Sequence, residues 1–260
     1  MTYDIKTNDF ELEYIESIIQ NSVLWENHCH AQYELIAVLE GDISIIIEGK
    51  SYLLTEGRNI IVPPLCYHSI RVNESRIYRR ITVLFDLSAV PEALRSEFVK
   101  KGSDVLIFSS PTVEKLGDIC QRKKPLFYAP LAESLMVQLF YDTLMESESN
   151  SGSETDEFLQ RVVFYIDEHL HEKILLDDLA RYTSRSKSSF CHLFEKKLNV
   201  SPKQYILQKK LALASKLIAD GTPPTVAAMQ IGYENYSNFY RLYLKQFGIS
   251  PTKKSKYRET

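Results

Sequence analysis

Short apolar runs separated by turn residues fill the first third of the chain. They cover residues 35–39, 43–48, 51–54, 60–63 and 77–85. The first two flank Glu40-Gly41-Asp42, which is a hairpin signal. Short strands at such regular spacing are typical of an antiparallel β-sandwich or barrel. We therefore expect residues 23–86 to form an all-β unit.

Two apolar patterns with helical spacing follow this unit, over residues 91–101 and 131–145. The second contains one apolar stripe made of Leu131, Leu135, Met136, Leu139 and Phe140. A stripe of this kind must be covered in the folded protein. We expect the helix to pack on the β unit, and pairing of the same stripe across a two-fold axis is the alternative.

A segment without apolar residues, ESESNSGSETDE, occupies residues 146–157. Its Ser, Glu and Gly content predicts a flexible linker. We place a sensor and dimerisation domain at residues 1–148, the linker at 149–157 and a second domain at 158–260. Helical patterns fill the second domain over residues 158–169, 176–182, 186–197, 202–219, 226–231 and 236–247. The expected fold is a two-domain chain, all-β with flanking helices before the linker and all-α after it.

The charge of the chain is divided between these two parts. Residues 157–260 hold 17 Lys and Arg against 10 Asp and Glu, a net charge of +7, whereas residues 1–156 hold 14 against 24, a net charge of −10. This asymmetry suggests that the basic part meets a polyanion. The four cysteines form no C-x-x-C pair, and no apolar run approaches the length of a membrane span. We therefore expect a cytoplasmic protein with free thiols and no membrane partner.

The second domain contains an internal repeat. Its matched pairs are Phe190 and Phe239, Leu193 and Leu242, Phe194 and Tyr243, and the Ser-Pro pairs at residues 201 and 250, with a one-residue insertion expected near Lys196. Ala180 and Ala228 precede the two copies, where a small residue lets helices cross closely in a helix-turn-helix unit. The helix at 202–219 joins the units; at ~1.5 Å per residue it is roughly 27 Å long, which would put the recognition helices about one DNA turn, on the order of 34 Å, apart.

Each repeated helix has an apolar face for the core and a polar face for a partner. Small polar residues with His or Arg suit the base edges of a major groove, and lysines suit the adjacent phosphates. The expected DNA contacts are Lys187, Ser188, Cys191, His192, Lys196 and Lys197 in the first unit, and Tyr236, Ser237, Tyr240, Arg241 and Lys245 in the second. For the serine, cysteine and tyrosines, a surface position without base contact is the alternative, and for Arg241 a surface salt bridge.

The end of the chain carries a longer motif. Gly232-Tyr233, Phe239-x-Arg241, the FGISP of residues 247–251 and Tyr257-Arg258 resemble the signature G-F-x-x-x-S-x-F-x-R-x-F-K-x-x-x-G-x-S-P-x-x-Y-R. Residues 174–257 thus resemble the DNA-binding domain of the AraC/XylS family of transcription regulators, which implies base contacts from both recognition helices. Departures from the family pattern are Ser184 and Arg185 in the first turn, and Pro224 and Ala227 in the second unit.

The β unit carries a second resemblance. Residues 28–41 have the spacing H-x-H-x3-E-x6-G, and residues 57–68 have the spacing G-x5-P-x4-H. Together they resemble the two motifs of cupins, although Leu65 stands where the second motif commonly has Gly. The resemblance implies a small antiparallel barrel with a central pocket, a natural container for a ligand.

The chemistry of these motifs leaves three interpretations open. Three imidazoles and a carboxylate can bind Zn, Mn or Fe, can contact an organic ligand directly, or can be structural polar groups. We expect no cofactor, with the metal ion, held by His28, His30, Glu34 and His68, as the alternative. The expected ligand-binding residues are Trp25, His28, His30, Glu34, Tyr67, His68 and Arg80.

The sequence therefore predicts a regulator that binds specific double-stranded DNA and is controlled by a small molecule of unknown identity. A homodimer, an activating role and contact with RNA polymerase are part of this expectation. A metal-dependent cupin enzyme would explain the histidines, but it leaves the repeated helices without a role and lacks an evident general base. We expect no enzyme, and a response to a protein partner instead of a small molecule stays open.

Overall fold

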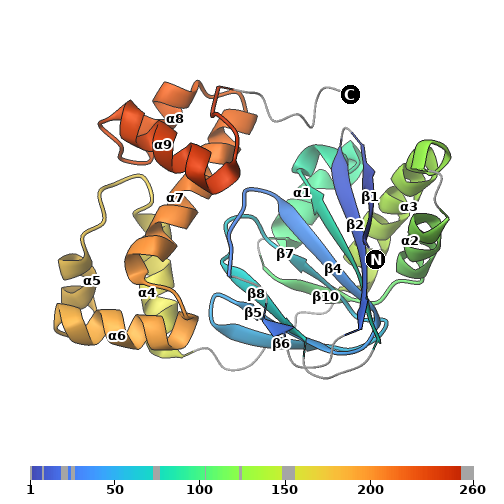
Figure 1. The fold of residues 1–260 in the computed structure, drawn as a ribbon, viewed down its shortest axis with the longest axis horizontal. Helices are drawn as coiled ribbons and strands as arrows, with labels where there is room; N and C mark the ends of the chain where they lie inside the picture. Colours follow the sequence, from blue (N-terminus) through green and yellow to red (C-terminus); the bar gives the residue numbers. More distant parts are fainter. Residues whose placement is uncertain are drawn as a thin grey trace.

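The computed structural model describes residues 2–7, 9–18, 23–24, 27–72, 77–102, 104–122, 125–147 and 156–252. Most of the predicted linker, together with Trp25 and Tyr257-Arg258, lies outside the described residues. A part built on sheets and a part built from helices stand side by side in Figure 1. Within the described residues, no helix is long and apolar enough to cross a membrane.

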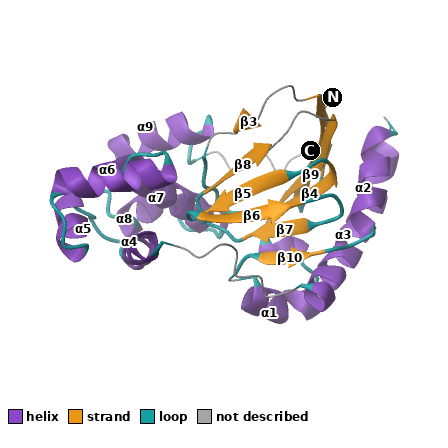
Figure 2. Cartoon of the chain, turned by 90° about the horizontal axis from the view of Figure 1, so that it is seen from below, coloured by secondary structure: helices purple, strands orange, loops and turns teal. Residues whose placement is uncertain are grey.

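The N-terminal domain contains two antiparallel sheets, shown in Figure 2. The larger has the order β1-β2-β9-β4-β7-β10, with β1 (Thr2–Lys6), β2 (Phe10–Ile18), β9 (Ile77–Phe85), β4 (Tyr33–Glu40), β7 (Asn59–Val62) and β10 (Leu106–Phe108). The smaller has the order β3-β8-β5-β6, with β3 (Val23–Leu24), β8 (His68–Val72), β5 (Ile43–Ile47) and β6 (Lys50–Leu54). This arrangement confirms the predicted cupin-like barrel.

Alternate side chains of the central strand β4 pack into two different apolar cores. Ile36 and Val38 face the smaller sheet, whereas Leu35 and Ala37 face a layer of helices on the other side. Because β4 is covered on both faces, its residues 34–38 are all buried, which explains its continuous apolar run. The helical layer contains α1 (Glu92–Lys101), α2 (Thr112–Gln121) and α3 (Pro125–Glu146), and a short 3-10 turn, η1 (Leu87–Ala89), precedes it.

The helix predicted over 131–145 begins earlier, because α3 continues through Pro130. Met136, Leu139 and Phe140 are buried against the sheet, as expected, and Leu135 is half-buried. Leu131 does not belong to this face, since it is 48% exposed on the outside of the helix. The helix therefore packs on the barrel with one apolar face and presents a second one outward.

Several elements of this domain were not predicted. Strands β1 and β2 lie before residue 23, outside the predicted β unit. The signal for β2 was present in the sequence, because the buried residues Phe10, Leu12 and Tyr14 alternate with acidic residues. Strands β8 and β10 and helix α2 were also missed. Strands β8 and β10 have only 5 and 3 residues, and they pair with β5 and β7, which stabilise apolar runs too short to be recognised alone.

The C-terminal domain is all-helical, as predicted. Its helices are α4 (Glu157–Glu168), α5 (Leu176–Tyr182), α6 (Lys187–Leu198), α7 (Pro202–Ala219), α8 (Pro224–Gln230) and α9 (Tyr236–Phe247). Helices α5 and α6 form one helix-turn-helix unit, α8 and α9 form the other, and α7 lies between them (Figure 1). Phe190 and Phe239 are fully buried at corresponding positions of α6 and α9, and Leu193 and Leu242 are half-buried.

The one-residue insertion expected near Lys196 is wrong. Helices α6 and α9 both have 12 residues, and the pairs from Phe190 and Phe239 onward keep one constant offset. The extra residue lies in the turn before α9, because Ala180 and Ala228 stand one position closer in number than the phenylalanines do. Both recognition helices can therefore be compared position by position.

Candidate functional site

Three histidines and one glutamate meet at the mouth of the barrel, and we call them the histidine cluster: His28, His30, Glu34 and His68. One potential ligand atom from each lies within 4.8 Å of the others. The Nε2 atoms of His28, His30 and His68 lie 3.8, 2.9 and 2.6 Å from Glu34 Oε2. Glu34 and His68 are buried, whereas the His28 side chain is 43% exposed. The cluster is therefore built inside the barrel and reachable from solvent at one edge.

The backbone fixes this convergence. His28 and His68 form a β-bridge, in which each backbone N–H donates to the other residue's carbonyl at 3.0 and 2.9 Å. Glu34 enters from β4 in the other sheet. The sequence motif thus brings together all four predicted residues from three places in the chain.

Charge within the cluster is set by burial and by the neighbours. Burial raises the pKa of Glu34, but His68 and the hydrogen bonds from the three imidazoles outweigh this effect and hold the pKa well below its usual 4.5. Burial lowers the pKa of His68 from 6.5. Glu34 is therefore ionised near pH 7, and burial opposes a positive charge on His68.

When His68 is neutral it has only one N–H, and this creates a conflict in the cluster. His68 Nδ1 lies 2.9 Å from the carbonyl of Cys66, while its Nε2 lies 2.6 Å from Glu34 Oε2. Either tautomer therefore leaves a nitrogen lone pair facing an oxygen. His30 makes the same two kinds of contact: its Nδ1 lies 2.9 Å from the carbonyl of Gln32, and its Nε2 lies 2.9 Å from Glu34 Oε2. A cation between the Nε2 atoms and the carboxylate would resolve the conflict at His68, and Nδ1–H of both His68 and His30 could then donate to a backbone carbonyl.

The other predicted ligand residues do not join this cluster. Trp25 lies outside the described residues. Arg80 is buried on the face of β9 that carries Tyr78, with its guanidinium carbon 6.0 Å from the centroid of that ring. Tyr67 points away from the barrel, and its ring centroid lies 5.0 Å from that of Tyr205 in α7.

The two recognition helices are stabilised in the same way. The side chain of Ser186 caps α6 by accepting the Ser189 N–H, and Asn235 caps α9 by accepting the Asn238 N–H. Both helices end at a residue with left-handed backbone, Asn199 in the first unit. The polar faces therefore begin and end at defined positions.

Most predicted DNA contacts lie on the surface. In α6, Lys187, Ser188, His192 and Lys196 are exposed, and Cys191 is half-buried. In α9, Ser237, Arg241 and Lys245 are exposed, while Tyr236 and Tyr240 are half-buried with ring centroids 6.3 Å apart. Their contact with DNA stays a prediction.

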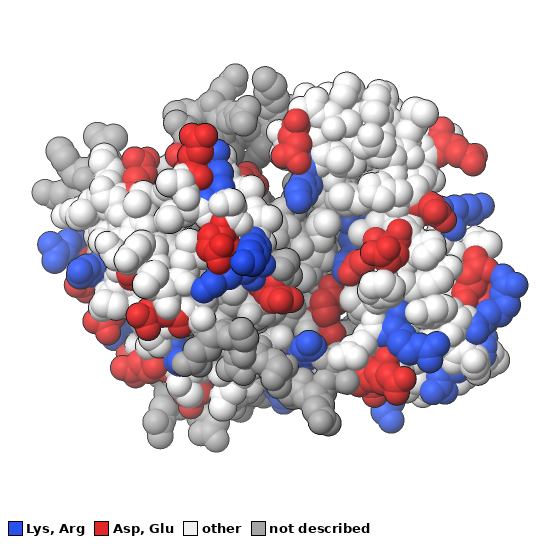
Figure 3. Space-filling model, turned by 180° about the vertical axis from the view of Figure 1, so that it is seen from behind, with Lys and Arg blue, Asp and Glu red and all other residues white. Residues whose placement is uncertain are grey.

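Two of the predicted lysines already have acidic partners. Lys187 Nζ lies 2.9 Å from Asp177, and Lys197 Nζ lies 2.6 Å from Asp156, the N-cap of α4. Both pairs are at least partly exposed, so a phosphate can compete with the carboxylates. Figure 3 shows further basic side chains along the outer edge of the helical domain, with acidic groups between them.

A contact between the two domains was missed in the sequence. Glu48 in the β5–β6 turn accepts hydrogen bonds from Lys209 Nζ at 2.8 Å and from the Tyr205 hydroxyl at 2.5 Å. Lys209 also pairs with Asp167 of α4 at 2.6 Å, and its side chain is only 2% exposed. The sequence signal for this contact was Lys209, which lies four residues after the buried Tyr205 and so on the same face of α7.

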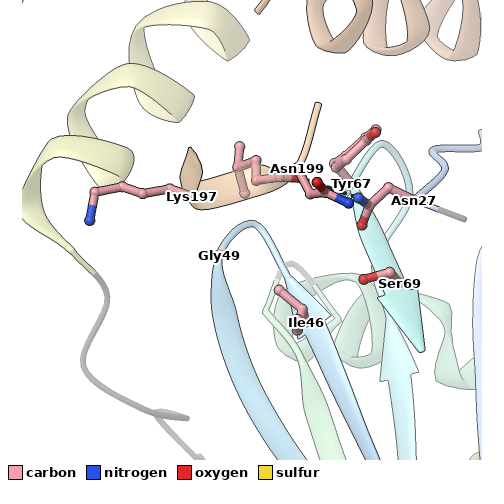
Figure 4. A pocket seen from close by; sticks show the side chains of 8 residues that line it. Asn27, Ile46, Gly49, Tyr67, Ser69, Lys197 and Asn199 are labelled. Atoms are coloured by element: carbon pink, nitrogen blue, oxygen red, sulfur yellow. Dashed lines mark hydrogen bonds between the residues drawn. The ribbon is translucent and has the colours of Figure 1, made fainter. Parts of the chain in front are cut away.

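A small cleft lies beside this contact, between β5, β8 and the end of α6. Asn27, Tyr67 and Ser69 of the barrel face Asn199 across it, while Lys197 points away (Figure 4). The Asn27 side chain donates to the carbonyl of Leu198 at 3.1 Å. The domains therefore touch through a small set of specific polar contacts.

Known protein families match both domains of the chain. Residues 10–159 match the family model of the AraC-like ligand binding domain, and residues 179–257 match that of a helix-turn-helix domain. The HTH-type transcriptional regulator YobQ of Bacillus subtilis is 24% identical over 88% of each chain. The thermoregulatory protein LcrF of Yersinia pestis is 24% identical over 86% of this chain and 89% of its own.

Solved structures give a more distant likeness. ToxT of Vibrio cholerae with an unsaturated fatty acid bound aligns over 95% of each chain with a TM-score of 0.44 and 10% identity. The C-terminal domain of the response regulator yesN of Fusobacterium nucleatum covers 38% of this chain and 96% of its own, with a TM-score of 0.36 and 24% identity. Because the ligand-binding model alone spans more than half of the sequence, the chain belongs to the AraC family of transcription regulators, with a ligand-binding domain followed by a helix-turn-helix DNA-binding domain.

Proposed function

We propose that this regulator senses a divalent transition-metal ion at the histidine cluster and converts its binding into a change in DNA binding. The observation that carries the proposal is the convergence of three Nε2 atoms on one oxygen of Glu34, with four potential ligand atoms within 4.8 Å. Neutral imidazoles and a carboxylate are the donors that Zn, Mn and Fe accept. A bound ion would place a positive charge beside the Glu34 carboxylate and would leave Nδ1–H of His30 and His68 to donate to the backbone carbonyls of Gln32 and Cys66.

The ion site can be tested on the purified full chain. We expect isothermal titration with zinc, manganese or ferrous ion near pH 7 to give one equivalent bound. Glu34→Gln and His68→Gln should each weaken binding at least tenfold, because loss even of a supporting residue costs about 10–100-fold. His171→Gln is the matched control, since His171 is an exposed histidine on the helical domain whose Nδ1 bonds the carbonyl of Gln230. No stoichiometric ion, or equal affinity in all variants, would refute the site.

We also propose that the regulator works as a homodimer through the outward face of α3. Val137, Tyr141 and Met145 follow one another four residues apart along this face and are 49%, 52% and 64% exposed. A helix that is apolar on both faces is normally buried on both. Helices α2 and α3 lie on the side of the barrel away from the helical domain (Figure 2), so two copies could pair there without covering the recognition helices.

The proposed output is activation of transcription in the cytoplasm, through contact with RNA polymerase. Two recognition helices in one chain support binding to adjacent half-sites, which is the geometry that positions a regulator beside a promoter. Selection of bound fragments from genomic DNA, followed by transcription from the selected promoters with and without the ion, tests this. A reproducible fall in transcript when the regulator is added would show repression instead.

A further inference from the structure

Two short segments of the barrel, residues 27–30 and 67–68, face the histidine cluster on one side and the DNA-binding domain on the other. Alternate residues of an extended chain point in opposite directions. His28, His30 and His68 point toward Glu34. Cys29 and Tyr67, between or beside them, are buried in one apolar cluster with residues of α4, α6 and α7.

Glu48 ties the second segment to the DNA-binding domain. Its backbone N–H donates to the carbonyl of Tyr67 at 2.9 Å, and its carboxylate accepts the Tyr67 N–H at 2.9 Å. The same carboxylate accepts the hydroxyl of Tyr205 and the ammonium of Lys209. Tyr67 and Glu48 therefore connect His68 to α7 through a continuous set of contacts.

The turn that contains Glu48 places this residue in a left-handed backbone conformation, which is strained for a glutamate. Glu48 and Gly49 have φ values of +48° and +81°, as both central residues of a type I′ hairpin require. Asn or Asp suits the first of these positions better than Glu does. A Cβ on residue 49 would lie 2.5 Å from Leu159 Cδ1, so glycine also allows the turn to approach α4. The strained glutamate is placed where its carboxylate meets a buried lysine.

We propose that ion binding at the histidine cluster and docking of the DNA-binding domain on the barrel favour each other. This inference rests on the proposed ion site. The docked helices cover the outer side of residues 27–30 and 67–68, and they thereby hold the three imidazoles in place. Ligands fixed in advance bind an ion with a smaller loss of conformational freedom. Because coupling between two sites is reciprocal, the ion must stabilise docking by the same factor.

The reciprocal effect can be measured by zinc titration of full-length variants. Glu48→Gln removes the charge that meets Lys209, and Tyr205→Phe removes only the hydroxyl while it keeps the ring beside Tyr67. We expect zinc affinity to fall about fivefold or more in Glu48→Gln, the lower end of typical coupling, and to fall less in Tyr205→Phe. Glu56→Gln, at an exposed carboxylate in the turn between β6 and β7, is the matched control and should bind zinc as the wild type does.

Hydrogen exchange measured by mass spectrometry gives a second readout that does not depend on affinity. Zinc should slow amide exchange in peptides covering residues 46–50 and 198–212 of the wild type, and should slow it less in Glu48→Gln. If the variants bind zinc with wild-type affinity and zinc leaves these peptides unchanged, the coupling is refuted while the ion site stands. If the wild type binds no zinc and His68→Gln behaves identically, the ion site itself fails, and the coupling falls with it.

Thermal unfolding of each variant separates these outcomes from misfolding. Tyr205→Phe retains every apolar contact of its ring, so it keeps the test valid if Glu48→Gln unfolds. Wild-type zinc affinity in a folded Tyr205→Phe, together with unchanged exchange in the wild type, would overturn the inference on its own.

Discussion

Ser184 and Gly232 occupy the same position in the turns of the two helix-turn-helix units. Each directly follows the C-cap residue of the first helix of its unit, which is Thr183 for α5 and Ile231 for α8. Each also has a left-handed backbone, with φ values of +54° and +81°. The hydrogen bonds match: the N–H of Ser184 donates to Arg181 as that of Gly232 donates to Met229. The two units thus share the same turn, but in the first unit Ser184 must adopt a backbone conformation that is strained for a residue with a side chain.

Replacing Ser184 with glycine should therefore stabilise the protein by about 1 kcal/mol, the cost of a left-handed conformation for a residue with a side chain. Gly232→Ala should destabilise it by at least about 1 kcal/mol, because the new Cβ would also lie 3.1 Å from the backbone of Glu172. Urea unfolding followed by circular dichroism measures both. A stabilising Gly232→Ala would show that the turn is not shared.

Two exposed residues of α9 should affect DNA binding differently. Arg241→Ala should cost about 1–3 kcal/mol on the cognate site and relax the preference at one base position. Lys245→Ala should weaken binding to all sequences alike and reduce the slope of affinity against salt by about one. Titrations of a selected site and of single-base variants at several salt concentrations separate the two. Uniform weakening by Arg241→Ala would make it a phosphate contact.

Charge on the outward face of α3 should dissociate the dimer. Tyr141→Glu places a carboxylate in the centre of the proposed interface, where it would have to lose its hydration. We expect sedimentation velocity to show a dimer for the wild type and a monomer for this variant at the same concentration. Leu53→Glu, at an exposed leucine of β6 (66% exposed), should remain a dimer. A monomeric wild type, or a dimeric Tyr141→Glu, would exclude this face.

Lys210 should make stability depend on pH. It donates to the carbonyls of Glu172 and Ile231, and burial lowers its pKa from 10.5 to about 8. Between these values the unfolded chain binds a proton that the folded chain has lost, so stability rises with pH in this window. The free energy of unfolding of the wild type relative to Lys210→Met should therefore increase from pH 8 to pH 10. Lys216→Met, at an exposed lysine of α7, is the control for the loss of a lysine from this helix.

Local sequence patterns were sufficient to predict the helices and strands whose main contacts are with residues nearby in the sequence. The Phe and Leu spacing around Phe190 and Phe239 predicted both recognition helices, and the two cupin-like motifs predicted the four residues that the structure brings together in the histidine cluster. Glu48 and Lys209 were not predicted as partners, because no spacing relates a turn glutamate to a lysine in another domain. Position 65 shows a further limit: Leu65 adopts a φ of +64°, the conformation for which the resembled motif commonly uses glycine.

The buried ammonium of Lys209 also limits how the sensor can be reused. Engineers who build chimaeric regulators usually join a sensor from one protein to an operator-reading domain from another at the connecting segment. Here such a graft would remove Glu48, one of the two carboxylates that pair with Lys209, and leave only Asp167 of α4 beside the ammonium. Removing one partner from a buried ionic group is destabilising. A working hybrid would have to carry the β5–β6 turn and the matching side of α7 together, so that the unit of exchange is the pair of surfaces and not the domain.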